Sequence, residues 1–291
     1  MEPILAKTVF PRTEVAGVSL PRMLIGTNWI CGYSHTSPAA DSLIMDTHCN
    51  TTVIGELLDA YLQHGIDAVM GPCFDSESLL GRAVNETEQR VGRPIIRIDT
   101  PILDVSDSAQ GRGNAKRRIE ASAKSGAVFC FPHHTCAEQL VCKHTETIDR
   151  LPDYLAMIRD AGLIPGLSAH MPELILYSDA NEYDVQTYVQ LYNCMGFLMQ
   201  VEVEYIHKVI WEAKKPVMSI KAMAAGRVSP FVGLSFSYAT LRDCDMVTLG
   251  AFTPEEVHED VEIALAAIQR RRPMLEGRSS PNKTAALGGE A

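Results

Sequence analysis

Two adjacent histidines, His133 and His134, follow a short apolar run that begins at residue 127. A third histidine, His170, ends the next such run, residues 164–170. If these runs are neighbouring parallel strands, they lie about 4.8 Å apart, and the imidazoles at their ends meet. An imidazole is a general acid or base near neutral pH and a common metal ligand. Because successive strand residues alternate in direction, we expect His133 to point into the site and His134 to point out.

The same side chains are also suited to a metal site. Histidine nitrogens and carboxylate oxygens bind zinc, manganese and iron in proteins. The candidate metal ligands are His35, His133, His134 and His170, with Asp75 or Asp99 as the carboxylate. No HxH or HExxH motif places two of these ligands together in the sequence. A divalent metal site is therefore one of two interpretations of these histidines, and acid/base catalysis is the other. Taken alone, His35 is equally well explained as a hydrogen-bonded residue on the rim of a site.

Lys221, in the run SIKAMA, is the one lysine within a predicted strand. Burial of a lysine lowers its pKa and makes its amine a nucleophile or a base. The alternative is a lysine paired with Asp99 or a nearby glutamate. We expect His133, His170 and Lys221 to carry the chemistry, with Asp99 as an orienting carboxylate. The side chains expected to contact a substrate are Asn28, Trp29, Tyr33, Phe74 and Asn193.

Eight short apolar runs alternate with longer amphipathic segments, which is the pattern of an α/β fold of the (β/α)8 TIM barrel type. The predicted strands are residues 22–29, 67–72, 94–101, 127–133, 164–170, 184–193, 216–224 and 245–251. The alternative, a doubly wound open sheet, is disfavoured because no GxGxxG follows the first strand. In a TIM barrel the active site lies at the C-terminal ends of the strands, where the histidines and Lys221 fall.

The segments between the predicted strands are predicted to be helices, and several carry recognisable capping residues at their ends. The clearest are residues 51–65, 76–92 with Ser76 as N-cap, 146–162, and a last helix that begins after Thr253. Residues 9–21 predict an N-terminal hairpin that closes the bottom of the barrel. We therefore expect one barrel domain, residues 1–272, and a disordered polar C-terminal tail, residues 273–291.

Composition narrows the class of protein further. The chain has 291 residues, 46% of them hydrophobic, and a net charge of −10, which argues against a nucleic-acid surface. Its apolar runs are too short for a membrane span and its start lacks a signal-peptide pattern, so we expect a cytoplasmic protein. The eight cysteines form no CxxC pair and are interpreted as reduced thiols.

Several sequence segments between residues 16 and 268 resemble segments of the aldo-keto reductases, and they occur in the same order. They are AGVSLPRMLIGTNW, SESLLGRAV, RRIEASAKSGAVFCFPHH, AGLIPGLSAHMPE, DVQTYVQLYN, IKAMAAGRVSP and LGAFTPEEVHEDV. The resemblance implies the same barrel and a carbonyl-reducing enzyme that uses NADPH with an Asp, Tyr, Lys and His tetrad. Only the histidine matches, at His133.

The other positions of the tetrad depart from that family. Its Asp position falls at about Val69 or Met70, its Tyr position at about Phe74 and its Lys position at Pro101. Phe74 has no hydroxyl to donate a proton to a substrate oxygen. The region LGAFTPEEVHED also lacks the basic run that holds the adenosine 2′-phosphate of NADPH. We therefore expect the scaffold and its substrate site to be kept while the chemistry differs.

Three functions follow from these observations. The first is an enzyme acting on a small oxygenated substrate, such as a sugar or hydroxy acid, by histidine-based acid/base or metal-assisted lyase, isomerase or hydrolase chemistry. The second is a divergent NAD(P)H-dependent oxidoreductase. The third is a non-catalytic scaffold in which the apolar segment 194–211 joins copies into a homo-oligomer, although we favour the simpler interpretation that most of this segment is the sixth helix packing on the barrel.

Overall fold

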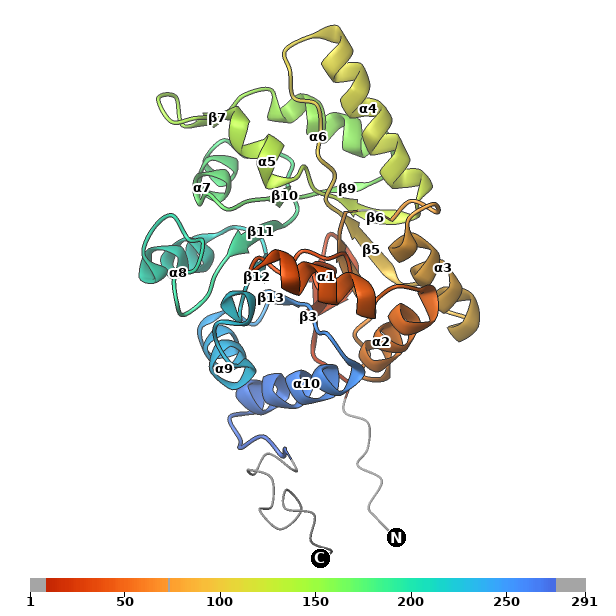
Figure 1. The fold of residues 1–291 in the computed structure, drawn as a ribbon. Helices are drawn as coiled ribbons and strands as arrows, with labels where there is room; N and C mark the ends of the chain where they lie inside the picture. The colour runs from red at the N-terminus through yellow and green to blue at the C-terminus, as the bar shows by residue number, and fades with distance from the viewer. Residues whose placement is uncertain (1–8, 73, 276–291) are drawn as a thin grey trace, which may run out of the picture.

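The computed structural model describes residues 9–72 and 74–275, which form strands surrounded by helices (Figure 1). Every run predicted as a strand contains one. The strands of the main sheet are β3 (Met23–Gly26), β4 (Ala68–Gly71), β5 (Ile96–Asp99), β6 (Ala127–Cys130), β9 (Ile164–Pro165), β10 (Leu167–Ser168), β11 (Tyr188–Leu191), β12 (Val217–Ile220) and β13 (Met246–Leu249). Residues 276–291 of the predicted tail lie outside the described residues.

The sheet closes into a barrel. Its strands are all parallel and run in the order β10-β11-β12-β13-β3-β4-β5-β6-β9. The two outermost members, β9 and β10, are halves of one predicted strand separated only by Gly166, so each pairs with one edge of the sheet. A Cβ on Gly166 would lie 2.3 Å from the ring of Phe131, which explains the glycine. The predicted (β/α)8 barrel is confirmed.

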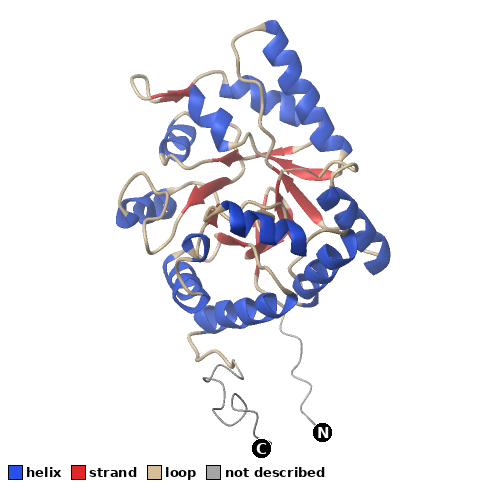
Figure 2. Ribbon diagram, viewed as in Figure 1, coloured by secondary structure: helices blue, strands red, loops and turns tan. Residues whose placement is uncertain are grey.

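Helices lie around the strands (Figure 2). The α-helices are α1 (Pro38–Thr47), α2 (Thr51–Gln63), α3 (Leu79–Val91), α4 (Ala109–Lys124), α5 (His134–Ala137), α6 (Leu151–Asp160), α7 (Glu173–Ala180), α8 (Val203–Glu212), α9 (Pro230–Thr240) and α10 (Pro254–Gln269). Two single turns of 3-10 helix, η1 (Glu138–Leu140) and η2 (Ala224–Gly226), follow α5 and β12. Among the helices of the described residues, none combines the length and the apolar character that a membrane span needs.

Two predicted helix starts were wrong. Helix α3 is capped by Ser78, whose hydroxyl accepts a hydrogen bond from the Gly81 amide at 2.9 Å, and not by Ser76. Helix α6 begins at Leu151 because the preceding residues pair as a small hairpin, β7 (Val141–Cys142) with β8 (Thr147–Ile148). The start of α10 is as predicted, since the Thr253 hydroxyl accepts from the Glu256 amide at 3.3 Å.

The N-terminal hairpin, β1 (Arg12–Val15) with β2 (Val18–Pro21), is the predicted one. Its Val15 and Leu20 are buried and belong to the same apolar cluster as the inward-facing residues of the barrel strands. That cluster includes Leu24, Met70, Ile98, Phe129, Phe131, Val189, Met218 and Met246. The hairpin therefore seals the N-terminal end of the barrel and leaves the opposite end for a site.

Candidate active site

A cavity of about 420 Å³ opens at the C-terminal ends of the barrel strands. It is lined by residues that come directly after the strands, among them Thr27, Pro72, Thr100, Lys221 and Gly250. Of the predicted site residues, the cavity wall includes Asn28, Trp29, Tyr33, His35, His133, His134, His170 and Lys221. This is the end of the barrel at which TIM-barrel enzymes bind their substrates.

Both histidines of the adjacent pair line the cavity, so the expectation that only His133 points inward was wrong. Strand β6 ends at Cys130, and His134 already begins helix α5, so the alternation of a strand no longer applies. The ring of His134 stacks on the ring of His170, with centroids 3.6 Å apart and planes 20° apart. The His133 ring lies beside it, with a centroid distance of 4.2 Å to the ring of His134.

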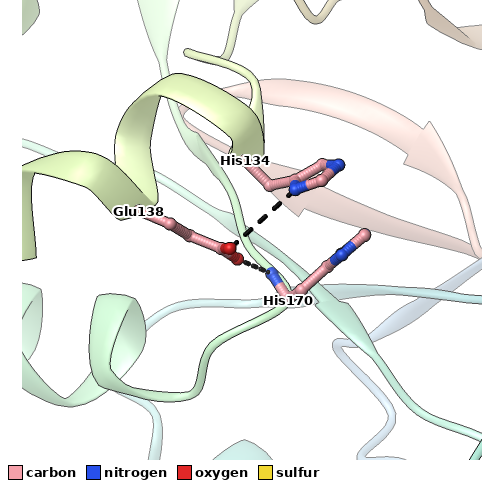
Figure 3. A group of neighbouring side chains, drawn as sticks. All are labelled: His134, Glu138 and His170. Atoms are coloured by element: carbon pink, nitrogen blue, oxygen red, sulfur yellow. Dashed lines mark hydrogen bonds and ion pairs between the residues drawn. The ribbon is translucent and has the colours of Figure 1, made fainter. Parts of the chain in front are cut away.

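Glu138 joins His134 and His170, as Figure 3 shows. It follows His134 by one helical turn, and one of its carboxylate oxygens lies 3.9 Å from Nδ1 of His134. The other oxygen accepts hydrogen bonds from the amides of His170, at 2.6 Å, and Met171, at 2.9 Å. One ligand atom from each of His134, Glu138 and His170 lies within 4.8 Å of the others. Glu138 was not predicted as a site residue, although its i, i+4 spacing from His134 is readable in HHTCAE.

The carboxylate of Glu138 is held in its charged form. Burial alone would raise its pKa, but the nearby His134 ring and the hydrogen bonds from the amides of His170 and Met171 outweigh burial and lower the pKa. The main chain of His170 is held on its other side too, because the buried amide of Gln190 donates to its carbonyl at 3.2 Å. Two elements, the α5–η1 turn and the end of β10, are thus fixed against each other.

The imidazoles of His133 and His170 are neutral at physiological pH. Burial, followed by the charge of His134, lowers the pKa of each to about 4. The unprotonated nitrogen of each neutral ring can accept a proton or bind a metal. Nδ1 of His133 lies 2.9 Å from the Thr135 hydroxyl, which fixes the orientation of that ring.

Lys221 enters the cavity from the end of β12. Its backbone has a φ of 66°, in the left-handed region that residues with a side chain seldom occupy, and its carbonyl accepts from the Ala224 amide at 2.7 Å. Burial lowers the pKa of its amine to about 8. The alternative pairing with Asp99 or a glutamate does not occur: among the described residues, no carboxylate forms an ion pair with Lys221.

His35 lies on the rim of the cavity. The side-chain amide of Asn28 donates to Nε2 of His35 at 3.0 Å, so the remaining ring proton is on Nδ1. Burial and the charge of Lys221 lower the pKa of His35. The carbonyl of His35 accepts from Arg227 at 3.3 Å, and the Arg227 guanidinium lies 4.1 Å from the centre of the Phe197 ring.

The structure does not bring three predicted residues to the cavity. Asp99 points outward from the barrel, where its carboxylate accepts from the Ser122 hydroxyl of α4 at 2.5 Å and its burial raises its pKa. Phe74 is buried beside the start of α3 and does not line the cavity. Asn193 is buried and accepts from the amides of Met195 and Phe197, at 3.2 and 2.8 Å, so it shapes a loop.

The alternative carboxylate, Asp75, is absent from the cavity wall as well. Its side chain accepts hydrogen bonds from the amides of Glu77, at 3.1 Å, and Ser78, at 3.0 Å, just before α3. Thr248, which was not predicted from the sequence, lines the cavity with a buried hydroxyl that has no hydrogen-bond partner among the described residues. No aspartate or glutamate is among the cavity-lining residues that the structure describes.

Comparison with solved structures identifies the class of fold. PA4992 of Pseudomonas aeruginosa, assigned to the aldo-keto reductases, superposes with a TM-score of 0.66 at 14% identity, over 92% of this chain and all of that one. The glycerol dehydrogenase of Gluconobacter oxydans gives 0.58 at 13% identity, over 96% of this chain and all of that one. An aldo-keto reductase of Bacillus halodurans, in its holo form, gives 0.58 at 12% identity, over 93% of this chain and 99% of that one.

The chain thus has the aldo-keto reductase type of TIM barrel, as the resemblance predicted. No protein-family model and no curated protein sequence matches it. At such low identity the likeness concerns the fold, so the chemistry has to be argued from the residues of the site.

The residues at the start of α10 do not fit the phosphate of a nicotinamide cofactor. The Glu256 amide already donates to Thr253, and the Glu256 carboxylate accepts from the Phe252 amide at 2.8 Å. Glu255 and Glu256 also give this first turn negative charge. An anion at this helix end would therefore meet like charge, where helix N-termini that bind phosphate present free amides.

Proposed function

We propose that this protein is a metal-assisted enzyme that acts on a small oxygenated substrate, with a divalent cation held by His134, Glu138 and His170. The observation that carries the proposal is the convergence of two imidazoles and one carboxylate beside a cavity of about 420 Å³. Two histidines and one carboxylate are the protein ligands of many catalytic zinc and iron sites, which keep further positions open for water or substrate.

The surroundings of these three residues favour a metal. The carboxylate of Glu138 is fixed by two main-chain amides, at 2.6 and 2.9 Å, as the ligands of metal sites are commonly fixed by their outer partners. The imidazole of His170 is already neutral, so binding a cation requires no proton loss from it. Bound there, a divalent cation would polarise a carbonyl or hydroxyl oxygen of the substrate.

The cavity wall sets the kind of substrate. The histidines and Lys221 offer nitrogen atoms that can bind a substrate oxygen, while most of the exposed surface of the wall is apolar and includes Met70, Val189, Ile220 and Leu249. Because the described wall has no carboxylate, it favours neutral or anionic molecules with oxygen atoms at one end. A sugar or a hydroxy or carbonyl acid meets this description. A cytoplasmic location and a role in carbohydrate metabolism belong to the same proposal.

The test is metal binding by purified, untagged protein, measured by elemental mass spectrometry and by thermal shift with Zn²⁺, Mn²⁺ and Fe²⁺. We expect about one ion per chain, lost in His134→Ala and in His170→Ala. Glu138→Gln should weaken binding by more than the roughly 10- to 100-fold that loss of an outer partner costs. The matched control is His144→Ala, which removes an exposed histidine outside the cavity wall. Retention of the metal by His134→Ala would refute the proposal.

A second candidate is a nicotinamide-dependent oxidoreductase, which the fold of the aldo-keto reductases favours. Its support is His133, which lies in the cavity where the resemblance places the histidine of the tetrad. Against it stand the absence of a hydroxyl at Phe74 and the occupied amides at the start of α10. Thermal shift with NADPH and NADH separates the two candidates: strong stabilisation by either nucleotide, with no metal bound, would favour the oxidoreductase.

A further inference from the structure

The proposed metal site does not explain why Lys221 lies in the cavity wall. Its neighbours in the cavity wall, Ile220, Ala222 and Met223, are apolar, and the described residues supply no carboxylate partner. A structural lysine would be expected to reach water or a counter-ion, because an unpaired buried ammonium is costly. Here the half-buried side chain lines the cavity and has no counter-ion among the described residues.

The backbone holds Lys221 in this position. Lys221, Ala224 and Ala225 all have left-handed conformations, with φ values of 66°, 48° and 55°. The strain of three such residues, each with a side chain, persists only where the surrounding structure imposes it, and it is typical of functional sites. The turn that results closes on itself through the Ala224 amide and the Lys221 carbonyl, 2.7 Å apart.

Arg227 cannot replace Lys221 in the cavity. It is not among the cavity-lining residues that the structure describes, and its guanidinium is held over Phe197 by hydrogen bonds to the carbonyls of Ala224 and His35, at 3.2 and 3.3 Å. By contrast, Lys221 lines the same cavity as His35 and His170.

We propose that Lys221 is a nucleophile that forms a Schiff base with the carbonyl carbon of a small aldehyde or ketone bound in the cavity. This rests on the proposed function and names its substrate class. The amine nitrogen bonds to the carbonyl carbon while the C=O π pair moves to the oxygen. A proton passes from nitrogen to that oxygen to give a carbinolamine. The remaining N–H proton passes to the hydroxyl oxygen, the C–O bond breaks so that water leaves, and the nitrogen electron pair forms the C=N bond that joins the substrate to Lys221.

The residues around the amine suit each of these steps. A desolvated lysine is neutral more often than an exposed one, and only the neutral amine attacks a carbonyl. His35 is a neutral imidazole on the rim, able to carry the proton between nitrogen and oxygen. The unpartnered hydroxyl of Thr248 in the same wall can donate a hydrogen bond to the substrate oxygen.

The experiment is reductive trapping of the full chain. Glycolaldehyde, dihydroxyacetone and pyruvate are each incubated with the protein at pH 7 and sodium cyanoborohydride, and the product is analysed by intact mass and peptide mapping. We expect one adduct per chain, with the mass of the carbonyl compound less one oxygen atom, on the peptide containing Lys221. With a pKa of about 8 against the ordinary 10.5, the neutral fraction at pH 7 is roughly 300-fold larger than for an exposed lysine.

Two variants sharpen the result. Lys221→Arg should lose the adduct, whereas Lys208→Arg, which changes an exposed lysine of α8, should keep it. Because wild-type peptide mapping locates the adduct directly, the test does not depend on the folding of a variant. In His134→Ala the Lys221 adduct should still form, since amine attack needs no metal. Labelling spread over exposed lysines with no preference for Lys221 would overturn the inference, and metal binding by the same wild-type protein would leave the proposed function standing.

Discussion

Replacement of Lys221 by methionine should stabilise the protein at pH 7. The pKa of Lys221 is about 8 in the folded chain and 10.5 when solvated, so folding is penalised wherever the amine is charged. At about 1.4 kcal/mol per pKa unit the full penalty is roughly 3 kcal/mol, and the partial exposure of the amine reduces it to about 2 kcal/mol. A methionine side chain carries no charge, so the Lys221→Met variant escapes this penalty.

The sign of the pH dependence follows from proton linkage. Between about pH 8 and pH 10.5 the unfolded state binds more protons at Lys221 than the folded state does, so wild-type stability gains with rising pH in that window. Below pH 8 both states are protonated and the penalty is complete. The advantage of Lys221→Met should therefore be largest at pH 7 and fall below about 1 kcal/mol at pH 10.

Urea unfolding of both proteins at pH 7 and pH 10 measures this difference directly. At pH 7 the melting temperature should also rise by roughly 4 to 8 °C. His35 and His170 line the same cavity as the amine, but burial lowers the pKa of both, so they stay neutral throughout this pH range and contribute no change of charge. Lys208→Met, at an exposed position, should change stability little at either pH. Equal stabilisation at both values, or destabilisation at pH 7, would show that the ammonium is not desolvated.

Three further substitutions test the packing that positions the site. Gly166→Ala should destabilise the barrel by about 1 to 3 kcal/mol, because its Cβ would lie 2.3 Å from Phe131; chemical denaturation measures the loss, and Phe131→Leu in the same chain should restore part of it. Thr253→Ala should cost about 1 kcal/mol through loss of the α10 cap, whereas Ser229→Ala should cost almost nothing, since Ser229 makes no capping bond to α9. Ser122→Ala should raise the pKa of Asp99 further, and an unchanged NMR titration of that carboxyl would contradict the bond between them.

Most of the barrel could be predicted because its signals are local. Each parallel strand is a short apolar run, and helices such as α2 and α10 carry their capping residues beside them in the sequence. The hairpin could be placed at the bottom of the barrel because it precedes the first strand. The predicted helix at residues 146–162 started too early because the pairing of Val141 with Ile148 overrides a sequence that also suits a helix.

The site was predicted less completely, because the sequence does not show directly which way each side chain points. Ile98 faces the barrel interior, so the next residue of the strand, Asp99, faces outward toward α4. The alternation of strand residues could have predicted this outward orientation of Asp99 from the sequence. Glu138 was missed because α5 and η1 are too short to be recognised as helical, and its i, i+4 spacing from His134 has a meaning only within a helical turn. The contacts of Phe74 and Asn193 depend on the conformation of loops, which no local sequence pattern predicts.

The pairing of β13 with β3 has a consequence for the synthesis of this protein. The Arg22 carbonyl, beside the first strand, accepts a hydrogen bond from the Val247 amide at 2.9 Å, and the Arg22 side chain donates to the Asp245 carbonyl at 3.1 Å. Those partners lie 223 residues or more further along the chain. Until the ribosome has released them, β3 has an open edge and the barrel cannot close. Closure of the barrel is therefore a late event that depends on the C-terminal part of the chain, and a chain that ends before Asp245 would leave the β3 edge unpaired.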